Sequence, residues 1–135
     1  MSSFSDRVID EFRANNGHVT TGGFGDSLVL VHSVGAKSGV ERVTPLLGLV
    51  DGESWFVAAS AAGAERHPAW YYNLLASPDT VIETPAGLVD VHATVLDGAE
   101  HDAAWAKFTS RGAAFNDYQA RAGDRTIPVV RLSRR

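Results

Sequence analysis

The chain has 135 residues, of which 44% are hydrophobic and 21% charged, with no cysteine and a formal net charge of −4. This length suits a single domain, residues 1–135, with one core, and the absence of cysteine excludes disulfides, thiolate metal sites and cysteine nucleophiles. The acidic balance argues against nucleic acid as a partner, and the lack of a signal peptide and of an apolar run of roughly 20 residues predicts a cytoplasmic protein.

The first half of the chain predicts one helix and three strands. Residues 1–17 are expected to form an N-terminal helix, since Phe4, Val8 and Phe12 recur every four positions. Runs rich in leucine and β-branched residues at 27–34, 43–50 and 54–60 predict strands, and the short segment between the last two is typical of a hairpin turn.

The second half alternates helices with strands. The segment 67–78 predicts a helix that opens at Pro68, with Trp70, Leu74 and also Leu75 on its inner face. Two alternating runs separated by a proline and a glycine predict a further hairpin. A longer amphipathic helix, a short helix and a final strand follow, and Pro128 predicts that this strand is an edge strand or a bulged one. The ranges of these five elements are 79–84, 88–96, 98–112, 113–123 and 125–132.

These elements together predict a mainly β fold with helical insertions. About six short antiparallel strands in hairpin-like pairs, with three to four helices between them, favour a small barrel or a strongly bent sheet. The long helical insertions argue against a sandwich.

The segment HSVGAKSGVERVTP, residues 32–45, has the composition of an anion site. Lys37, Ser38 and Arg42 supply two cations and a hydroxyl, and backbone N–H groups around Gly35 and Gly39 could form a concave nest for phosphate. The segment is not a P-loop, because no glycine-rich run precedes the lysine and a strand follows instead of a helix. A solvated turn has much the same composition, so the residues alone leave both interpretations open.

No other catalytic centre is visible in the sequence. The five histidines have no metal-ligand spacing, so no metal site is predicted, and the absence of a G-x-S-x-G elbow removes the anchor for serine hydrolase chemistry. What remains is the segment 57–74, in which Ser60 and Gly63 lie among small residues and three aromatics and Asn73 follow in a helix. Small residues let a flat ligand approach the backbone closely. An anion loop beside such a segment fits a flat cofactor with a phosphorylated tail, which would itself carry the chemistry.

The order of four motifs resembles the deazaflavin (F-420)-dependent nitroreductase family of actinobacteria. These motifs are ANNG, GAKSGVERVTPLL, VAASAAGAERHPAWYYNLLASPD and YQARAGDRTIPVVRL, and they extend over nearly the whole chain. The resemblance implies a split β-barrel of the FMN-binding-like type, a bound 8-hydroxy-5-deazaflavin coenzyme (F-420) with an anionic oligoglutamate tail, and hydride transfer to a small electron-poor acceptor. Quinones, activated alkenes and nitro compounds are such acceptors.

The resemblance also assigns site residues. The loop would hold the phosphate and the tail of the coenzyme, and residues on both sides of the ring would hold the ring. Two hydroxyl groups would bind the acceptor and stabilise the negative charge that develops on it. Phe115 would form an apolar wall. The implied cofactor-binding residues are Lys37, Ser38, Gly39, Arg42, Pro45, Leu46, Ala59, Ser60, Gly63, Arg66, Trp70 and Asn73, and the implied catalytic residues are Ser60 and Tyr118.

Two departures from the family pattern carry expectations. Ala36 stands where the family often has arginine, which predicts weaker binding of the tail, and Phe115 stands where nitroimidazole-reducing relatives carry tyrosine, which argues against nitro-drug reduction. An FMN-dependent reductase of the same fold and a non-enzymatic binder of lipid or cofactor remain as alternatives. Small split barrels often pair, so a homodimer is expected by fold analogy. A quinone acceptor would favour peripheral contact of the N-terminal helix with the inner face of the cell membrane, whereas Asp6, Asp10 and Glu11 argue against strong attraction to an anionic surface.

Overall fold

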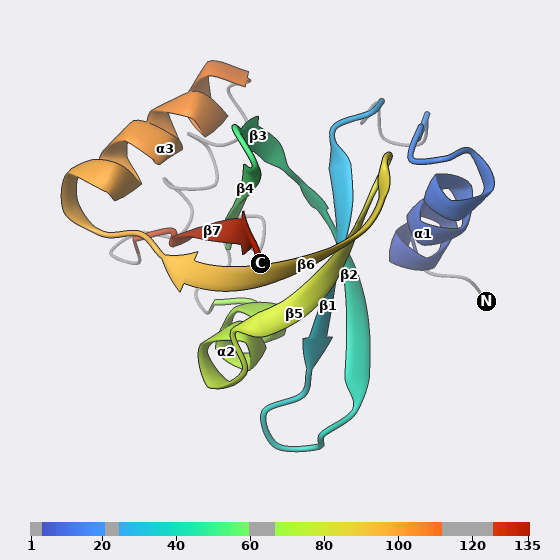
Figure 1. Ribbon diagram of the computed structural model, residues 1–135, viewed down its shortest axis with the longest axis horizontal. Coiled ribbons are helices and arrows are strands. Elements are labelled where there is room, and N and C mark those ends of the chain that lie inside the picture. Colours follow the sequence, from blue (N-terminus) through green and yellow to red (C-terminus); the bar gives the residue numbers. More distant parts are fainter. Residues whose placement is uncertain (1–3, 21–24, 60–66, 112–125) are drawn as a thin grey trace.

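The computed structural model describes residues 4–20, 25–59, 67–111 and 126–135. These residues form three helices and seven strands (Figure 1). In chain order they are α1 (Phe4–Ala14), β1 (Leu28–Val34), β2 (Glu41–Leu47), β3 (Leu49–Asp51), β4 (Ser54–Ala58), α2 (Ala69–Ala76), β5 (Asp79–Thr84), β6 (Gly87–Val95), α3 (Gly98–Arg111) and β7 (Val129–Arg134).

One antiparallel sheet contains all seven strands, in the order β2-β1-β5-β6-β7-β4-β3. The two outermost strands, β2 and β3, are separated in the chain by Gly48 alone. Because a single residue joins the two ends of the sheet, the sheet must curl until its edges meet, and Figure 1 shows this curl. The curled antiparallel sheet with inserted helices confirms the predicted fold class.

Gly48 also explains why there are seven described strands instead of about six. The run 43–50 was expected to be one strand, but it divides at Gly48, whose N–H donates to the Ser27 carbonyl at 2.8 Å. A Cβ at this position would lie 3.0 Å from the Val29 side chain, so glycine allows the backbone to cross closely over β1.

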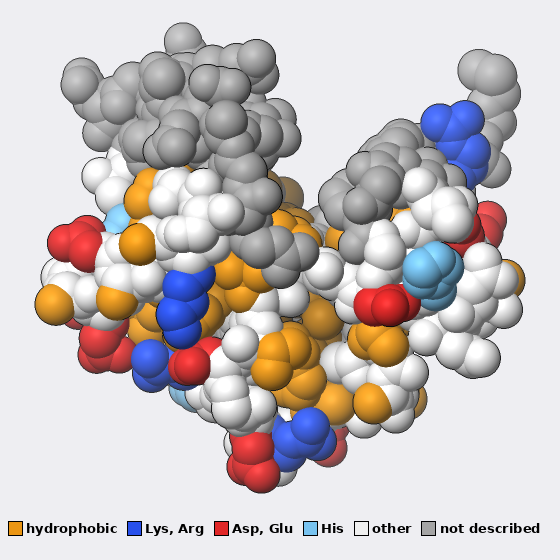
Figure 2. Space-filling view, turned by 90° about the horizontal axis from the view of Figure 1, so that it is seen from above, with side chains coloured by type: hydrophobic (Ala, Val, Ile, Leu, Met, Phe, Trp, Pro, Cys, Tyr) orange, Lys and Arg blue, Asp and Glu red, His pale blue; other side chains and the backbone are white. Residues whose placement is uncertain are grey.

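Three clusters of buried side chains hold the helices on the sheet. Helix α1 packs Val8 and Phe12 against Leu28 and Leu30 of β1, and the N–H of Gly17 donates to the Phe12 carbonyl beyond the end of the helix. Helix α2 lies against the central cluster through Trp70 and Leu74, and α3 covers β4 and β7 through Ala104 and Phe108. Seen from above, hydrophobic side chains also gather in the hollow between the α1 side and the α3 side (Figure 2).

Two local predictions are wrong. Leu75 does not share the inner face of α2, since its side chain is 52% exposed. The final strand is neither an edge strand nor bulged at Pro128, because β7 begins at Val129 and pairs with both β6 and β4. Pro128 precedes the strand and needs only its carbonyl, which accepts the Ala59 N–H at 2.9 Å. The short helix expected at 113–123 lies outside the described residues.

Charged groups hold α1 to β5. The guanidinium of Arg13 donates two hydrogen bonds to the Glu83 carboxylate, at 3.1 and 2.8 Å. The two ring nitrogens of His32 lie 2.9 Å from Glu41 and 2.8 Å from Glu83. The Arg13 bonds, helped by the His32 contact, hold the pKa of the Glu83 carboxyl below its usual range.

This network predicts acid-sensitive stability. Because the pKa of Glu83 is lower in the folded protein, its stabilisation is complete above the unfolded value of about 4.3 and is lost as pH falls through the folded pKa. We therefore expect Glu83→Gln to lower the melting temperature at neutral pH, and expect its difference from the wild type to shrink below about pH 4. Thermal unfolding at several pH values measures this, with Glu53→Gln in an exposed turn as the control; a difference independent of pH would contradict the assignment.

Candidate functional site

The register of β1 and β2 determines which side chains share a face. Cross-strand partners in an antiparallel pair point to the same side of the sheet. Val29 pairs with Leu46 and Val31 with Thr44, and the two valines belong to the central cluster with Trp70 of α2. The next pair on this face is Ser33 with Arg42. The face therefore changes from apolar to polar beside α2.

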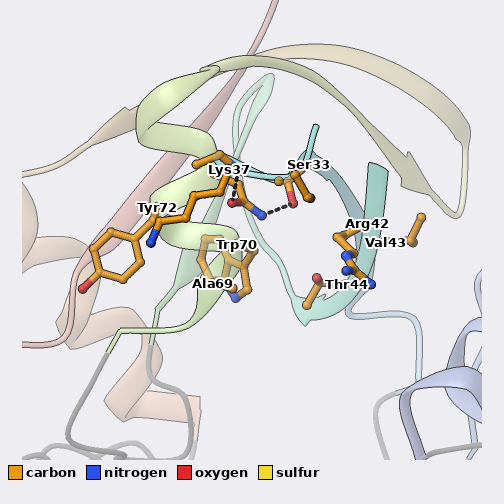
Figure 3. Close-up of a pocket in the computed structure, with 12 residues that line it drawn as sticks. Ser33, Lys37, Arg42, Val43, Thr44, Ala69, Trp70 and Tyr72 are labelled. Carbon is orange, nitrogen blue, oxygen red and sulfur yellow. Dashed lines mark hydrogen bonds between the residues drawn. The ribbon is translucent and has the colours of Figure 1, made fainter. Parts of the chain in front are cut away.

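A cavity of about 650 Å³ lies where this face of the sheet changes from apolar to polar. Its walls are the end of β1, the loop that follows, residues 42–44 of β2 and the first residues of α2 (Figure 3). Five of the residues assigned by the family resemblance line it, namely Lys37, Ser38, Arg42, Trp70 and Asn73.

The cavity carries positive charge. Lys37 comes from the loop and Arg42 from β2, and Figure 3 shows the two side chains on different sides of the cavity. No aspartate or glutamate lines it, and within the described ranges no carboxylate lies within 4.0 Å of either cation. Two cations without a neutralising partner favour an anionic ligand.

Asn73 joins α2 to the loop. Its side chain is 7% exposed, its Oδ1 accepts the Ala36 N–H at 3.0 Å, and its Nδ2 donates to the Ser33 hydroxyl at 3.3 Å. The dashed lines in Figure 3 mark both bonds. This amide therefore connects α2 to the neighbouring loop, and its hydrogen bond to Ala36 fixes the residue before Lys37.

The N–H groups of the two loop glycines are already used inside the loop. The Gly35 N–H donates to the Val40 carbonyl and the Gly39 N–H to the Gly35 carbonyl, each at 2.9 Å, so both donors are used inside the loop. The Ser38 hydroxyl accepts the Val40 N–H at 3.2 Å. A Cβ at Gly35 would clash with this hydroxyl, and Gly39 has a φ of 70°. The glycines thus shape the turn, and the charge comes from side chains.

The aromatic residues of α2 have different exposures. Trp70 is 5% exposed and packs into the core at the cavity wall, whereas Tyr72 is 48% exposed at the rim. Tyr72 also contacts Tyr71, with ring centroids 5.5 Å apart, and burial raises the pKa of Tyr71. The flat surface that a ligand can reach is therefore mainly that of Tyr72.

The other assigned residues lie elsewhere. Leu46 packs against the central core cluster, and Ala59 is fully buried within it. Pro45 pairs with Leu30 and so faces α1, on the opposite side of the hairpin, and Gly39 does not line the cavity. Ser60, Gly63, Arg66, Phe115 and Tyr118 lie outside the described residues.

The residues assigned from the family resemblance leave out seven that line the cavity, namely Ser33, Gly35, Ala36, Val43, Thr44, Ala69 and Tyr72. Ser33, Val43 and Thr44 are ordinary strand residues, and only the pairing of β1 with β2 brings them to the cavity. Tyr72 could have been found from the aromatic run in the helix, but the run alone does not show which ring points to the cavity.

The chain resembles known proteins over most of its length. The model of the family described as F-420H(2)-dependent quinone reductase matches residues 6–133. An F-420H(2)-dependent quinone reductase of Mycobacterium tuberculosis is 36% identical over 110 residues, which are 79% of this chain and 73% of the relative.

Two solved structures have the same fold. A structure described as an F-420-H2 dependent reductase superposes with a TM-score of 0.71 at 30% identity, over 79% of this chain and 94% of its own. A second, described as a domain-swapped dimer, gives a TM-score of 0.74 at 29% identity, over 94% of this chain and 96% of its own. These matches confirm the split-barrel fold, the oxidoreductase class and the F-420 coenzyme expected from the motifs. The chain belongs to the F-420H(2)-dependent quinone reductase family.

Proposed function

We propose that this chain reduces a small hydrophobic quinone with reduced F-420, which it binds in the cavity between β2 and α2. Lys37 and Arg42 line this cavity and have no acidic partner among the described residues, and this is the observation that carries the proposal. The volume of about 650 Å³ lies in the usual range for cofactor sites. Two cations suit a phosphate and an acidic tail, so the residues present fit the coenzyme.

The coenzyme, when bound, supplies a hydride from C5 of its reduced ring. The chain's own residues bind the coenzyme and orient its ring. Arg42 and Lys37 hold the anionic part from two sides, Asn73 keeps the loop in position, and Tyr72 covers the outer side of the cavity. Such binding fixes the reactive face toward the acceptor, which lowers the entropic part of the barrier.

The acceptor would contact residues beyond the cavity described above. We assign the hydrogen bond to its oxygen to Ser60 and Tyr118, and an apolar wall to Phe115. A hydroxyl that donates to a quinone oxygen stabilises the negative charge that develops as hydride arrives. Activated alkenes and nitro compounds are the other acceptors to test, and we expect nitro compounds to react slowly because Phe115 replaces a tyrosine.

A titration tests the proposal directly. Purified protein is titrated with oxidised F-420 and, in parallel, with FMN, and tryptophan fluorescence is recorded. Trp70 forms part of the cavity wall and should be quenched by a bound ring. Tight binding of F-420, weak binding of FMN and oxidation of F-420H(2) by a naphthoquinone would support the proposal. Binding of FMN alone, or of co-purified lipid with no coenzyme, would favour the two alternatives.

Tyr72 offers a smaller test of the same site. Its exposed ring borders the cavity, so Tyr72→Ala removes apolar contact area from a bound ring. We expect the Kd for F-420 to rise about fivefold to tenfold, the equivalent of roughly 1–1.5 kcal/mol for one aromatic contact. Leu75→Ala, an exposed position on α2 outside this cavity, is the control; equal effects of the two variants would contradict the placement of the ring.

We also propose that the chain forms a homodimer, since a solved relative at 29% identity is described as a domain-swapped dimer. Sedimentation of the purified protein measures this. In the part of the chain that the structure describes, no helix has the length and apolar character to cross a membrane. A cytoplasmic location and contact of α1 with the inner membrane face stay predictions, which fractionation of cells would test.

A further inference from the structure

A row of four side chains crosses the face of the sheet that α1 covers. Arg13 of α1 donates two hydrogen bonds to the Glu83 carboxylate on β5. Nε2 of His32, on β1, lies 2.8 Å from Glu83, and Nδ1 of the same ring lies 2.9 Å from Glu41 on β2. The row therefore links α1 to three strands, and His32 connects its two carboxylates.

The two contacts of His32 form together only when its ring is protonated. An ionised carboxylate accepts hydrogen bonds and donates none, and a neutral imidazole has a single N–H that can donate to one carboxylate. A protonated ring has two N–H groups and donates to both. When the ring loses its proton, the row therefore breaks at one of the two contacts.

Glu41 is the carboxylate that a neutral ring would release. The Glu83 side chain is 17% exposed and is also held by Arg13, whereas the Glu41 side chain is 65% exposed and can turn into water. Water replaces a lost hydrogen bond easily at an exposed group and poorly at a sheltered one. The single N–H of the neutral ring therefore stays with Glu83, and Glu41 loses its partner on β1.

Other charged groups face this row from α1. Asp6, Asp10 and Arg13 line a cavity of about 530 Å³ between α1 and β2, together with Glu41. The charge of Asp10 also acts on the Arg13 guanidinium. Carboxylates and guanidinium groups ordinarily titrate far below and far above the range of histidine, so a change in this row near neutral pH reports the ring of His32.

The row lies behind the coenzyme cavity, on the opposite face of the same two strands. Successive residues of a strand point to opposite faces. On β2, Glu41 belongs to the row and its neighbour Arg42 lines the cavity, and on β1 His32 and Ser33 are divided in the same way. Among the described strands β2 pairs with β1 alone, and Glu41 is its first residue. The start of β2 is thus held by its pairing with β1 and by the contact between His32 and Glu41.

We propose that His32 is a positioning residue for the coenzyme, whose protonated ring holds Glu41 and thereby keeps the neighbouring Arg42 at the cavity. The inference rests on the proposed function and deepens it. When the ring loses its proton, the first residues of β2 gain conformational freedom, and binding must then order Arg42 at a cost in entropy. Coenzyme binding is therefore tighter below the pH at which His32 titrates and weakens as the pH rises through it.

The test measures the Kd for oxidised F-420 by tryptophan fluorescence at about pH 6 and about pH 9, on either side of the range in which histidine titrates. Any titration of the coenzyme itself contributes equally to every variant, so the ratio of the two Kd values is compared between variants. We expect the Kd to rise between the two pH values by a factor about twofold to fivefold larger in the wild type than in His32→Gln, because the amide cannot change its charge.

Glu41→Gln provides the same test at an exposed position, and it applies even if His32→Gln does not fold. It should lose the same pH dependence, because the ring then has no carboxylate on β2 to hold. His18→Gln is the matched control, since His18 also pairs with a carboxylate, Asp26 at 2.9 Å, and does not line the coenzyme cavity. His18→Gln should reproduce the ratio of the wild type.

Removing Arg42 distinguishes positioning from a general effect on the fold. In the Arg42→Ala background, His32→Gln should no longer change the ratio of the two Kd values, since no guanidinium is left to position. Equal pH dependence in the wild type and His32→Gln, or an effect of His32→Gln that persists without Arg42, would overturn the inference and leave the proposed function standing. Failure of the wild type to bind F-420 at both pH values would contradict the proposed function and the inference together.

Discussion

Removing both cations of the coenzyme cavity should weaken binding of F-420 by about a hundredfold. Lys37 and Arg42 line the same cavity and, within the described residues, have no acidic partner that would compete with a ligand. A charge-assisted hydrogen bond contributes about 1.5–3 kcal/mol, and because both side chains are exposed we take the lower end for each. Lys37→Ala and Arg42→Ala should therefore each raise the Kd about tenfold, and the effects should add in the double variant if the two cations hold separate groups of the ligand.

The chain provides close controls for this experiment. Lys107 is the only other lysine in the sequence, and it lies on α3 beside Asp51, away from the cavity. Arg134 lies over the Trp55 ring and serves the same purpose for arginine. We expect Lys107→Ala and Arg134→Ala to change the Kd by less than about twofold. Should the double variant bind F-420 as tightly as the wild type, the anionic part of the coenzyme binds elsewhere.

Replacing Asn73 by leucine should reduce both stability and coenzyme affinity. Leucine has a similar volume but leaves the Ala36 N–H and the Ser33 hydroxyl without their present partner. Ser33 is 1% exposed, so its hydroxyl cannot turn to water without local rearrangement. Leaving one buried polar group unsatisfied costs about 1–3 kcal/mol, and since Ser33 is buried whereas Ala36 is exposed, the expected loss in the free energy of unfolding is roughly 1–3 kcal/mol. Urea denaturation measures it.

The effect on affinity arises through Lys37, which follows Ala36 directly. If Asn73 positions the loop, Lys37→Ala should cost less affinity in the Asn73→Leu background than in the wild type, and the double-mutant cycle measures that coupling. Asn15→Leu, at an exposed position after α1, controls for the chemical change itself. Strict additivity of the Asn73 and Lys37 effects on the Kd would show that the amide stabilises the fold without positioning the cation.

Local patterns were sufficient for most of the secondary structure. The hydrophobic repeat of α1, the alternation in β5 and β6 and the turn at 51–54 are all where the sequence predicts them, because each depends on neighbouring residues in the chain. The prediction that 43–50 is one strand was wrong for a non-local reason. Its apolar run is continuous, and only the closure of the sheet requires a break at Gly48.

The position of β7 illustrates the same limit. A proline near a strand predicts an edge position from local chemistry, since it removes a donor from the ladder. In the folded chain Pro128 lies one residue before β7, and the strand itself occupies an interior position between β6 and β4. Strand order depends on the pairing of segments far apart in the sequence, about which a local rule has no information.

The candidate site, like the fold, could be predicted from the sequence only in part. Local sequence is enough to place Lys37, Ser38 and Arg42 in one hairpin loop and its following strand, to place Asn73 within a helix, and to show which family the motifs resemble. The folded chain is needed to show that the pairing of Ser33 with Arg42 turns the arginine toward α2, that Asn73 bonds a loop 37 residues away, and that Tyr72 instead of Trp70 presents its ring. The packing of α1 beside β2 also places Asp6 and Asp10 at the same cavity as Arg42. Composition and short-range periodicity specify local conformation, whereas strand register and helix docking depend on burial of side chains contributed by distant segments.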